Sequence, residues 1–140
     1  MYQFFHSHIL LSISFISILL IASYYELYYI FYKDIIYINS EDVVPLLNTF
    51  SAIVFDFRDK DVYFAQHIAT SVNIDSNKID FNYLKKKYYN KKIIIINNQK
   101  LSKRKLIKLL LNEGFSDIYF LKNGILDWSK NGFLLVTKKS

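Results

Sequence analysis

The feature that most constrains this chain is an uncharged apolar segment near its amino terminus. The segment from Ile9 to Tyr25, ILLSISFISILLIASYY, has seventeen residues and contains no charge, proline or glycine. As an α-helix it would cover most of the ~30 Å hydrocarbon layer of a bilayer. We therefore expect one membrane span at about residues 9–28, within an anchor at 1–32, followed by one domain at 33–140.

The end of the span is expected near Glu26. A carboxylate at the bilayer centre costs about 2.5–3.5 kcal/mol on insertion scales, whereas at headgroup level it can reach water. The surrounding tyrosines are typical of an interfacial aromatic belt and are Tyr24, Tyr25, Tyr28, Tyr29 and Tyr32. The alternative is a secretory signal peptide, but no Lys or Arg precedes the apolar run and no convincing small-x-small cleavage site follows it. A retained anchor is favoured.

The distribution of charge predicts the orientation of the span. All 18 Lys and Arg lie at or after Lys33, so the positive-inside rule places the carboxyl-terminal domain in the cytoplasm and the amino terminus outside. The absence of cysteine agrees with a reducing compartment.

The domain at 33–140 is basic, with 18 basic and 11 acidic residues and a net charge of +7. The anionic cytoplasmic leaflet would attract such a domain. Nucleic acid is not the favoured partner, because no helix-turn-helix, zinc-finger or RNP signature accompanies the lysines. No metal site is expected either, since His6 and His8 are too few and too close to the membrane.

The domain alternates short apolar runs with amphipathic segments. We expect strands at 34–38, 52–57, 72–74, 93–96 and 117–121, and helices at 40–50, 79–89, 102–112 and 124–130. In the first of these helices, Ser40 or Asp42 is expected as the cap and Pro45 in the first turn. This alternation predicts an α/β fold with a mostly parallel sheet flanked by helices.

The stretch IIIINNQKLSKRKLIKLLLNEGF contains the expected ligand-binding loop. A buried strand, Ile93 to Ile96, is followed by a short polar loop and then by a helix. In open parallel sheets, the crevice beyond the carboxyl ends of the strands is where ligands usually bind.

Two further stretches resemble the signatures of the rhodanese-like domain. IVFDFRDKDVYFAQHIATSVNI is similar to the family's D-x-R, aromatic, G-H-I and N-I pattern, with Gln66 in place of the glycine. LLNEGFSDIYFLKNGILDWSKNG is similar to the second signature, and its matching residues are Gly114, Gly124, Trp128 and Gly132, with Asn123 in place of the first of the paired glycines. The resemblance covers 39–135 and implies a rhodanese-like sheet. With the preceding span, the chain resembles the membrane-anchored single-domain rhodanese-like proteins of bacteria, which implies the inner membrane.

The first motif also has a structural interpretation. Asp56 ends an apolar strand, where its carboxylate can accept amides of the next turn, and Arg58 can pair with it or with Asp61. His67 has no visible nucleophile beside it and is interpreted as a residue that stabilises a turn.

The second motif has a structural interpretation as well. Gly114 is predicted to end the preceding helix in the left-handed conformation, with Phe115 packing back onto the last turn. Trp128 is predicted to fill the core rather than to stack on a ligand.

The resemblance also shows what this chain has lost. Active rhodanese-like sulfurtransferases have a cysteine after this strand, which carries sulfur as a persulfide, and its position here is Asn97. Because the chain contains no cysteine, persulfide chemistry is excluded for this chain acting alone. Ser102 is conceivable as a nucleophile, but no base is positioned for it, and a helix-capping role is favoured.

Two functions remain open, neither of which requires a cofactor. The first is a catalytically inactive, membrane-tethered module that binds a protein partner. The second is an anion-binding pseudo-enzyme that holds a sulfur oxyanion or phosphate. The loop expected to bind that anion consists of Asn97, Asn98, Gln99, Lys100, Leu101, Ser102, Lys103 and Arg104. A thiosulfate-type sulfurtransferase ranks third, because only the family resemblance suggests it.

Overall fold

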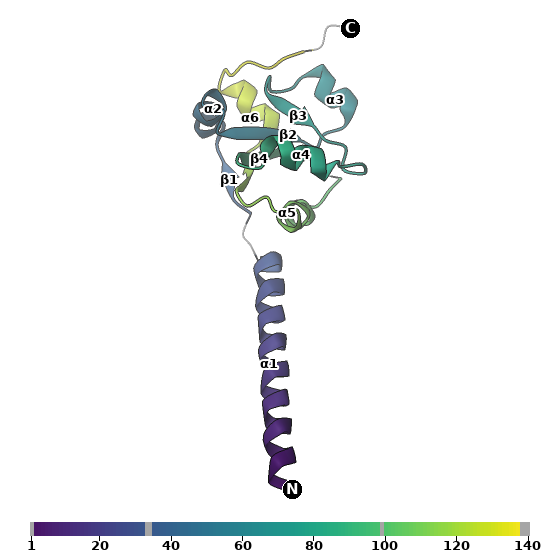
Figure 1. Cartoon of the computed structure of the whole chain (residues 1–140). Coiled ribbons are helices and arrows are strands. Elements are labelled where there is room, and N and C mark those ends of the chain that lie inside the picture. The colour runs from purple at the N-terminus through teal and green to yellow at the C-terminus, as the bar shows by residue number, and fades with distance from the viewer. Residues whose placement is uncertain (1, 33–34, 99, 138–140) are drawn as a thin grey trace. The chain divides into compact units, whose positions relative to one another are not determined.

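A computed structural model describes residues 2–32, 35–98 and 100–137 of this chain, with the side chains of the first range described from 8 to 29 (Figure 1). The chain divides into two compact units, Met1–Asp34 and Ile35–Ser140.

The first unit is a single helix, α1 (Tyr2–Tyr32). It contains a candidate membrane span, His8–Tyr29, of 22 residues with a mean hydropathy of 1.8. The helix continues past Glu26, so this residue does not end it. Hydroxyl groups within the span bond to the helix's own carbonyls: Ser14 Oγ donates to Leu11 at 2.8 Å. Hydrogen bonds within the helix satisfy polar side chains in the core of a bilayer, where no water is available to bond them.

The second unit contains a sheet of five parallel strands. The strands are β1 (Tyr37–Ile38), β2 (Ala52–Asp56), β3 (Ser71–Asn73), β4 (Lys92–Ile96) and β5 (Ile118–Leu121), in the order β1-β5-β4-β2-β3. The central strands β2 and β4 pair over their whole length, with Asp56 opposite Ile96. Every strand therefore ends at the same edge of the sheet, which we call the carboxyl edge, and begins at the opposite, amino edge.

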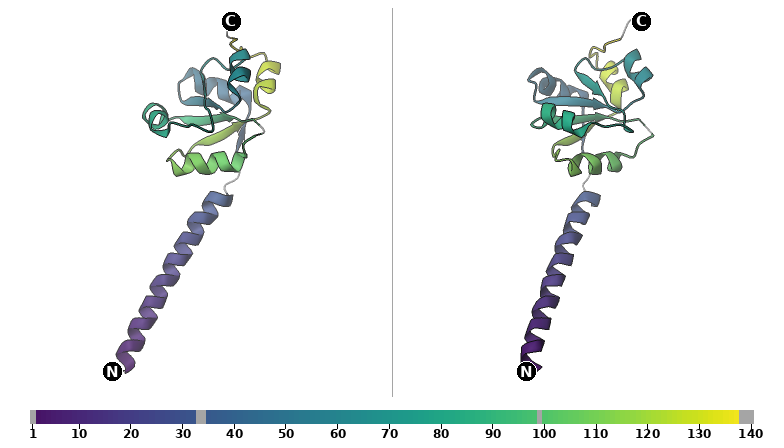
Figure 2. Two further views of the ribbon diagram at one scale, coloured as in Figure 1. Left: turned by 90° about the vertical axis from the view of Figure 1, so that its right-hand side faces the viewer. Right: turned by 45° about the vertical axis from the view of Figure 1, so that its right-hand side comes forward.

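Helices cover both faces of this sheet (Figures 1 and 2). On one face, α4 (Phe81–Tyr88) and α5 (Lys103–Asn112) pack against alternate strand residues such as Phe55, Ile93 and Phe120. On the other face, α2 (Ser40–Asn48) and α6 (Gly124–Lys130) pack against Val54 and Ile94. Burial on both faces explains why the strands are continuous apolar runs. The predicted fold class is confirmed.

Two features of the domain differ from the prediction. A short helix, α3 (Lys60–Ala65), follows β2 and was not predicted. The strand β1 is shorter than the predicted segment 34–38, of which Asp34 lies outside the described residues. The other strand boundaries shift by a residue at one end or both.

The helix α2 begins at Ser40 as predicted, but the predicted cap is wrong. The cap is Asn39, and the side chain of Ser40 is fully buried in a different role. Ser40 Oγ donates to Asp127 at 3.0 Å and accepts from Asn131 Nδ2 at 2.6 Å. Pro45 lies in the second turn of the helix rather than the first. The tertiary bonds to α6 thus replace the local capping bond that the sequence suggested.

The end of α5 has the predicted left-handed glycine. Gly114 has a φ of +92°, and its amide donates to Leu111 at 3.0 Å while the amide of Phe115 donates to Leu110 at 3.0 Å. This bonding pattern is the Schellman motif, in which glycine carries no steric penalty. Phe115 packs into the core as predicted.

The end of α2 has the same bonding pattern without a glycine. The amides of Phe50 and Ser51 donate to Leu47 and Leu46 at 3.1 and 2.9 Å, and Phe50 has a φ of +55°. A residue with a Cβ costs about 1–2 kcal/mol in this conformation. The ring of Phe50 is 74% exposed, so core packing does not offset that cost.

Candidate functional site

The end of β2 contains a buried ion pair. Asp56 is fully buried, and its carboxylate accepts hydrogen bonds from the amide of Arg58 at 3.0 Å and from the guanidinium at 2.7–3.0 Å. The same guanidinium donates to the carbonyl of Gln66 at 2.9 Å. Arg58 therefore pairs with Asp56 rather than with Asp61, and the pair fixes the loop before and after α3.

Asn73 supports this loop from the neighbouring strand. Its amide nitrogen donates to the carbonyls of Asp56 at 3.1 Å and Arg58 at 2.9 Å. Asn73 belongs to the N-I part of the first signature, but its role was not predicted because the sequence does not reveal that β3 lies beside β2.

The contacts of His67 connect parts of the fold. Its ring stacks on Tyr63 with centroids 4.1 Å apart, and Nδ1 donates to the carbonyl of Tyr63 at 2.9 Å in the tautomer that this contact requires. Its backbone exchanges two hydrogen bonds with Val136, at 3.0 and 2.7 Å. His67 thus holds the segment after α6 against α3.

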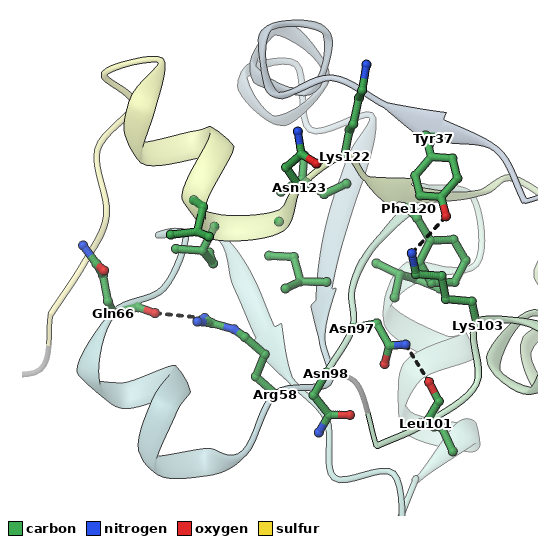
Figure 3. Close-up of a pocket in the computed structure, with 16 residues that line it drawn as sticks. Tyr37, Arg58, Gln66, Asn97, Asn98, Leu101, Lys103, Phe120, Lys122 and Asn123 are labelled. Atoms are coloured by element: carbon green, nitrogen blue, oxygen red, sulfur yellow. Dashed lines mark hydrogen bonds between the residues drawn. The ribbon is translucent and has the colours of Figure 1, made fainter.

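The loop after β4 is closed by Asn97. Its Nδ2 donates to the carbonyl of Leu101 at 2.7 Å, and the amide of Lys100 donates to Asn98 Oδ1 at 3.1 Å. The Oδ1 of Asn97 is buried, has no hydrogen-bond partner and points away from Leu101 (Figure 3). Gln99, which belongs to the predicted anion loop, lies outside the described residues.

A cleft of about 1050 Å³ lies at the carboxyl edge of the sheet, beside Asn97 (Figure 3). It lies between the ends of β4 and β5 and the start of α6, and its apolar lining includes Phe120 and the exposed Leu126. The cations that line it are Lys103, Lys122 and Arg58, the last already paired with Asp56, and the described residues of the lining include no carboxylate.

Lys103 is held at this cleft by an aromatic pair. Its ammonium donates to Tyr37 Oη at 2.9 Å and lies 4.7 Å from the centroid of that ring and 5.7 Å from that of Phe120. Cation–π contacts of this length stabilise the charged form without neutralising it. The first turn of α5 therefore directs a positive charge toward the cleft.

Other residues of the predicted anion loop do not face the cleft. Lys100 pairs with Asp59 at 2.6 Å instead of facing the cleft, and Arg104 is exposed and does not line it. Ser102 occupies the cap position of α5, but its side chain makes no capping hydrogen bond. Ser102 is thus at the predicted cap position, without the hydrogen bond by which a serine side chain usually caps a helix.

Two cleft residues were missed in the sequence. Lys122 and Asn123 follow β5, and Asn123 adopts the left-handed conformation with a φ of +55°. The signal was its position at the first of the family's paired glycines, since Asn tolerates positive φ best after glycine. Within the described part of the chain, no three His, Asp or Glu side chains gather as metal ligands.

Comparison with known proteins agrees with this geometry. The model of the rhodanese-like domain family matches residues 39–131. A Buchnera aphidicola (Schizaphis graminum) protein is 29% identical over 138 residues, which are 98% of this chain and 93% of that protein. The thiosulfate sulfurtransferase GlpE of Pseudoalteromonas translucida is 26% identical over 92 residues, which are 66% of this chain and 87% of that protein.

A solved structure has the same fold. The crystal structure of the BH2092 protein from Bacillus halodurans gives a TM-score of 0.59 at 24% identity, covering 73% of this chain and 77% of that chain. The family match extends from the cap of α2 through α6 and includes the buried Asp56–Arg58 pair and the loop at Asn97. This chain belongs to the rhodanese-like domain family.

Proposed function

We propose that this protein is a membrane-anchored, catalytically inactive rhodanese-like protein whose cleft binds a segment of a protein partner. The observation that carries the proposal is Asn97, which occupies the family's nucleophile position in a chain without cysteine. A carboxamide cannot accept a sulfur atom as a persulfide. The cleft beside it nevertheless remains open and has a cationic rim.

The lining of the cleft favours a peptide segment over an inorganic anion. The lining combines cations with apolar side chains such as Phe120 and Leu126, whereas an inorganic anion would use only the cations. Lys103 and Lys122 fit an acidic side chain, and the exposed Leu126 fits an apolar one.

The proposal includes the topology of the chain. The helix α1 would anchor the protein in the inner membrane, with the amino terminus outside and the domain in the cytoplasm, because every Lys and Arg follows the span. Resistance to carbonate extraction tests the anchor. Labelling of single introduced cysteines from either side of the membrane tests the orientation.

Photocrosslinking in cells tests the partner. A photoreactive residue at Leu126, in the full-length protein, should capture one reproducible protein. That adduct should be lost when Lys103→Glu is added, because the substitution reverses a charge at the cleft. A photoreactive residue at Tyr83, which is exposed but does not line this cleft, is the matched control. The same adducts at both positions, or adducts unaffected by Lys103→Glu, would contradict the proposal.

The second candidate is an anion site. Lys103 and Lys122 in the lining favour it, together with the amino terminus of α5. It predicts that thiosulfate or phosphate slows alkylation of a cysteine introduced as Asn97→Cys, and that Lys103→Glu abolishes this protection. Equal alkylation rates with and without these anions would exclude it.

A further inference from the structure

We propose that the amino edge of the sheet is a docking surface for anionic lipid headgroups. The amino-edge surface consists of Phe50, Tyr89, Lys91 and Lys92. It lies at the opposite end of the strands from the cleft, so a partner in the cleft and a lipid at the amino edge would not compete. The inference rests on the anchoring proposed above and is independent of what the cleft binds.

The residues of this surface lie together before the starts of two neighbouring strands. The amide of Lys92 donates to the carbonyl of Ser51 at 2.9 Å. The ammonium of Lys91 lies 5.8 Å from the ring centroid of Phe50. These contacts connect the segment before β2 with the segment before β4.

The apolar side chains at this edge are unusually exposed. Phe50 is 74% exposed and Tyr89 69%. Phe50 is also held at a positive φ in the position that glycine occupies at the end of α5. Its ring contacts the Lys91 ammonium at the surface instead of the core, so burial does not offset the backbone strain. Strain that the fold does not need is a reason to look for a binding role.

The charge at this edge matches an anionic surface. Its lysines are Lys86, Lys87, Lys91 and Lys92. Asp117 is also at this edge, and Glu113 is paired with Lys85 at 2.6 Å, so positive charge remains in excess. Aromatic rings beside lysines are typical of proteins that contact the headgroup region.

The path of the chain favours a lipid surface over a soluble partner. The domain begins at Ile35, and two residues separate it from the end of α1, so three Cα–Cα steps span at most roughly 11 Å. A tether of this length keeps the domain at a high effective concentration beside the bilayer that is proposed to hold α1.

Site-directed fluorescence quenching in the full-length protein tests the proposal. The natural chain has no cysteine, so Asn90→Cys places one label at the amino edge and Asn77→Cys places one after β3, at the carboxyl edge. The protein is reconstituted in phosphatidylcholine vesicles with and without phosphatidylglycerol, containing lipids with a nitroxide at the headgroup. We expect strong quenching at position 90 that requires phosphatidylglycerol, and weak quenching at position 77.

Matched substitutions identify the residues responsible. Lys91→Glu should lower the docked-to-undocked ratio by more than about fivefold, because loss of the lysine alone corresponds to ~1 kcal/mol and the new carboxylate adds repulsion. Lys60→Glu makes the same change of charge at the carboxyl edge, in the first turn of α3, and should have no such effect. Phe50→Gly should reduce quenching while removing the strain, so a loss of docking could not be attributed to unfolding.

Three outcomes would overturn the proposal. They are equal quenching at positions 90 and 77, quenching at 90 that is independent of phosphatidylglycerol, and no difference between Lys91→Glu and Lys60→Glu. The second outcome would indicate a zwitterionic or protein contact instead. Carbonate extraction of the same preparation reports on the anchor separately, so a failed anchor is distinguishable from failed docking.

Discussion

The two central strands end in neighbouring loops that differ in how completely their polar atoms are bonded. At the end of β2, both carboxylate oxygens of Asp56 accept hydrogen bonds, and the paired Arg58 also bonds to Gln66. At the end of β4, directly opposite in register, Asn97 leaves its buried oxygen without a partner. The first loop is a closed structural network, and the second has bonding capacity that the protein itself does not use.

This difference distinguishes the residues that maintain the fold of the family from the residue that carries its chemistry. The charged pair at β2 lies in a fully buried position, where loss of either partner would leave an uncompensated charge. The residue at position 97 has no such constraint, because its substitution changes one loop and the lining of one cleft. A rhodanese-like domain can therefore lose its thiol while its fold is retained.

The largest expected effect is that of Asp56→Ala. The substitution leaves the guanidinium of Arg58 without its carboxylate and should lower the free energy of unfolding by about 3–5 kcal/mol. Pulse proteolysis of the full-length protein in membranes measures this loss. Asp61→Ala, which removes an exposed carboxylate on α3, should change the free energy by less than about 0.5 kcal/mol. Similar losses for both variants would show that the buried pair is not what holds the loop.

A smaller effect is expected for Asn73→Ala. The substitution removes two donors, to the carbonyls of Asp56 and Arg58, and should lower the free energy of unfolding by about 1–3 kcal/mol. The same proteolysis measurement applies. Asn77→Ala, on the exposed turn after the same strand, is the control and should be nearly neutral. A neutral Asn73→Ala would mean that the β2 loop keeps its shape without this support.

The sequence predicts well the features that depend on residues close together in the chain. Strands with continuous isoleucines, the left-handed Gly114 and the buried Trp128 follow from local patterns, because each depends on neighbours in the chain. The helix α3 was missed because six residues with mixed polarity show no helical periodicity. Ser40 was assigned to a cap because its true partner, Asp127, lies 87 residues away.

The composition of the cleft was harder to predict for the same reason. Lys122 joins Lys103 at the cleft only because β5 lies beside β4 in the sheet, and sequence does not specify the strand order. Lys100, by contrast, is in the predicted loop, but its charge is neutralised by Asp59 in the loop after β2. Membership of a loop thus does not establish that a charge faces a ligand.

A thiol introduced at position 97 reports the charge that acts on the loop after β4. In the full-length Asn97→Cys variant, Lys103 and the amino terminus of α5 should lower the pKa of the introduced thiol below its usual ~8.5. Each unit of lowering corresponds to about 1.4 kcal/mol. The pH dependence of alkylation measures it, with Lys103→Glu added as the control. A thiol whose pKa is not lowered would mean that the cations at the cleft do not act at position 97.

The smallest effect is expected for Lys100→Ala. This lysine pairs with Asp59 at 2.6 Å, but both side chains are exposed, and exposed pairs contribute about 0–1 kcal/mol to stability. Because Lys100 does not line the cleft, the substitution should also leave crosslinking from Leu126 and alkylation at position 97 unchanged. Lys122→Ala, which removes one charge from the cleft lining itself, is the matched comparison and should reduce both. If Lys100→Ala had the larger effect, the binding surface would be the β4 loop facing Asp59, and the cleft would not be the site.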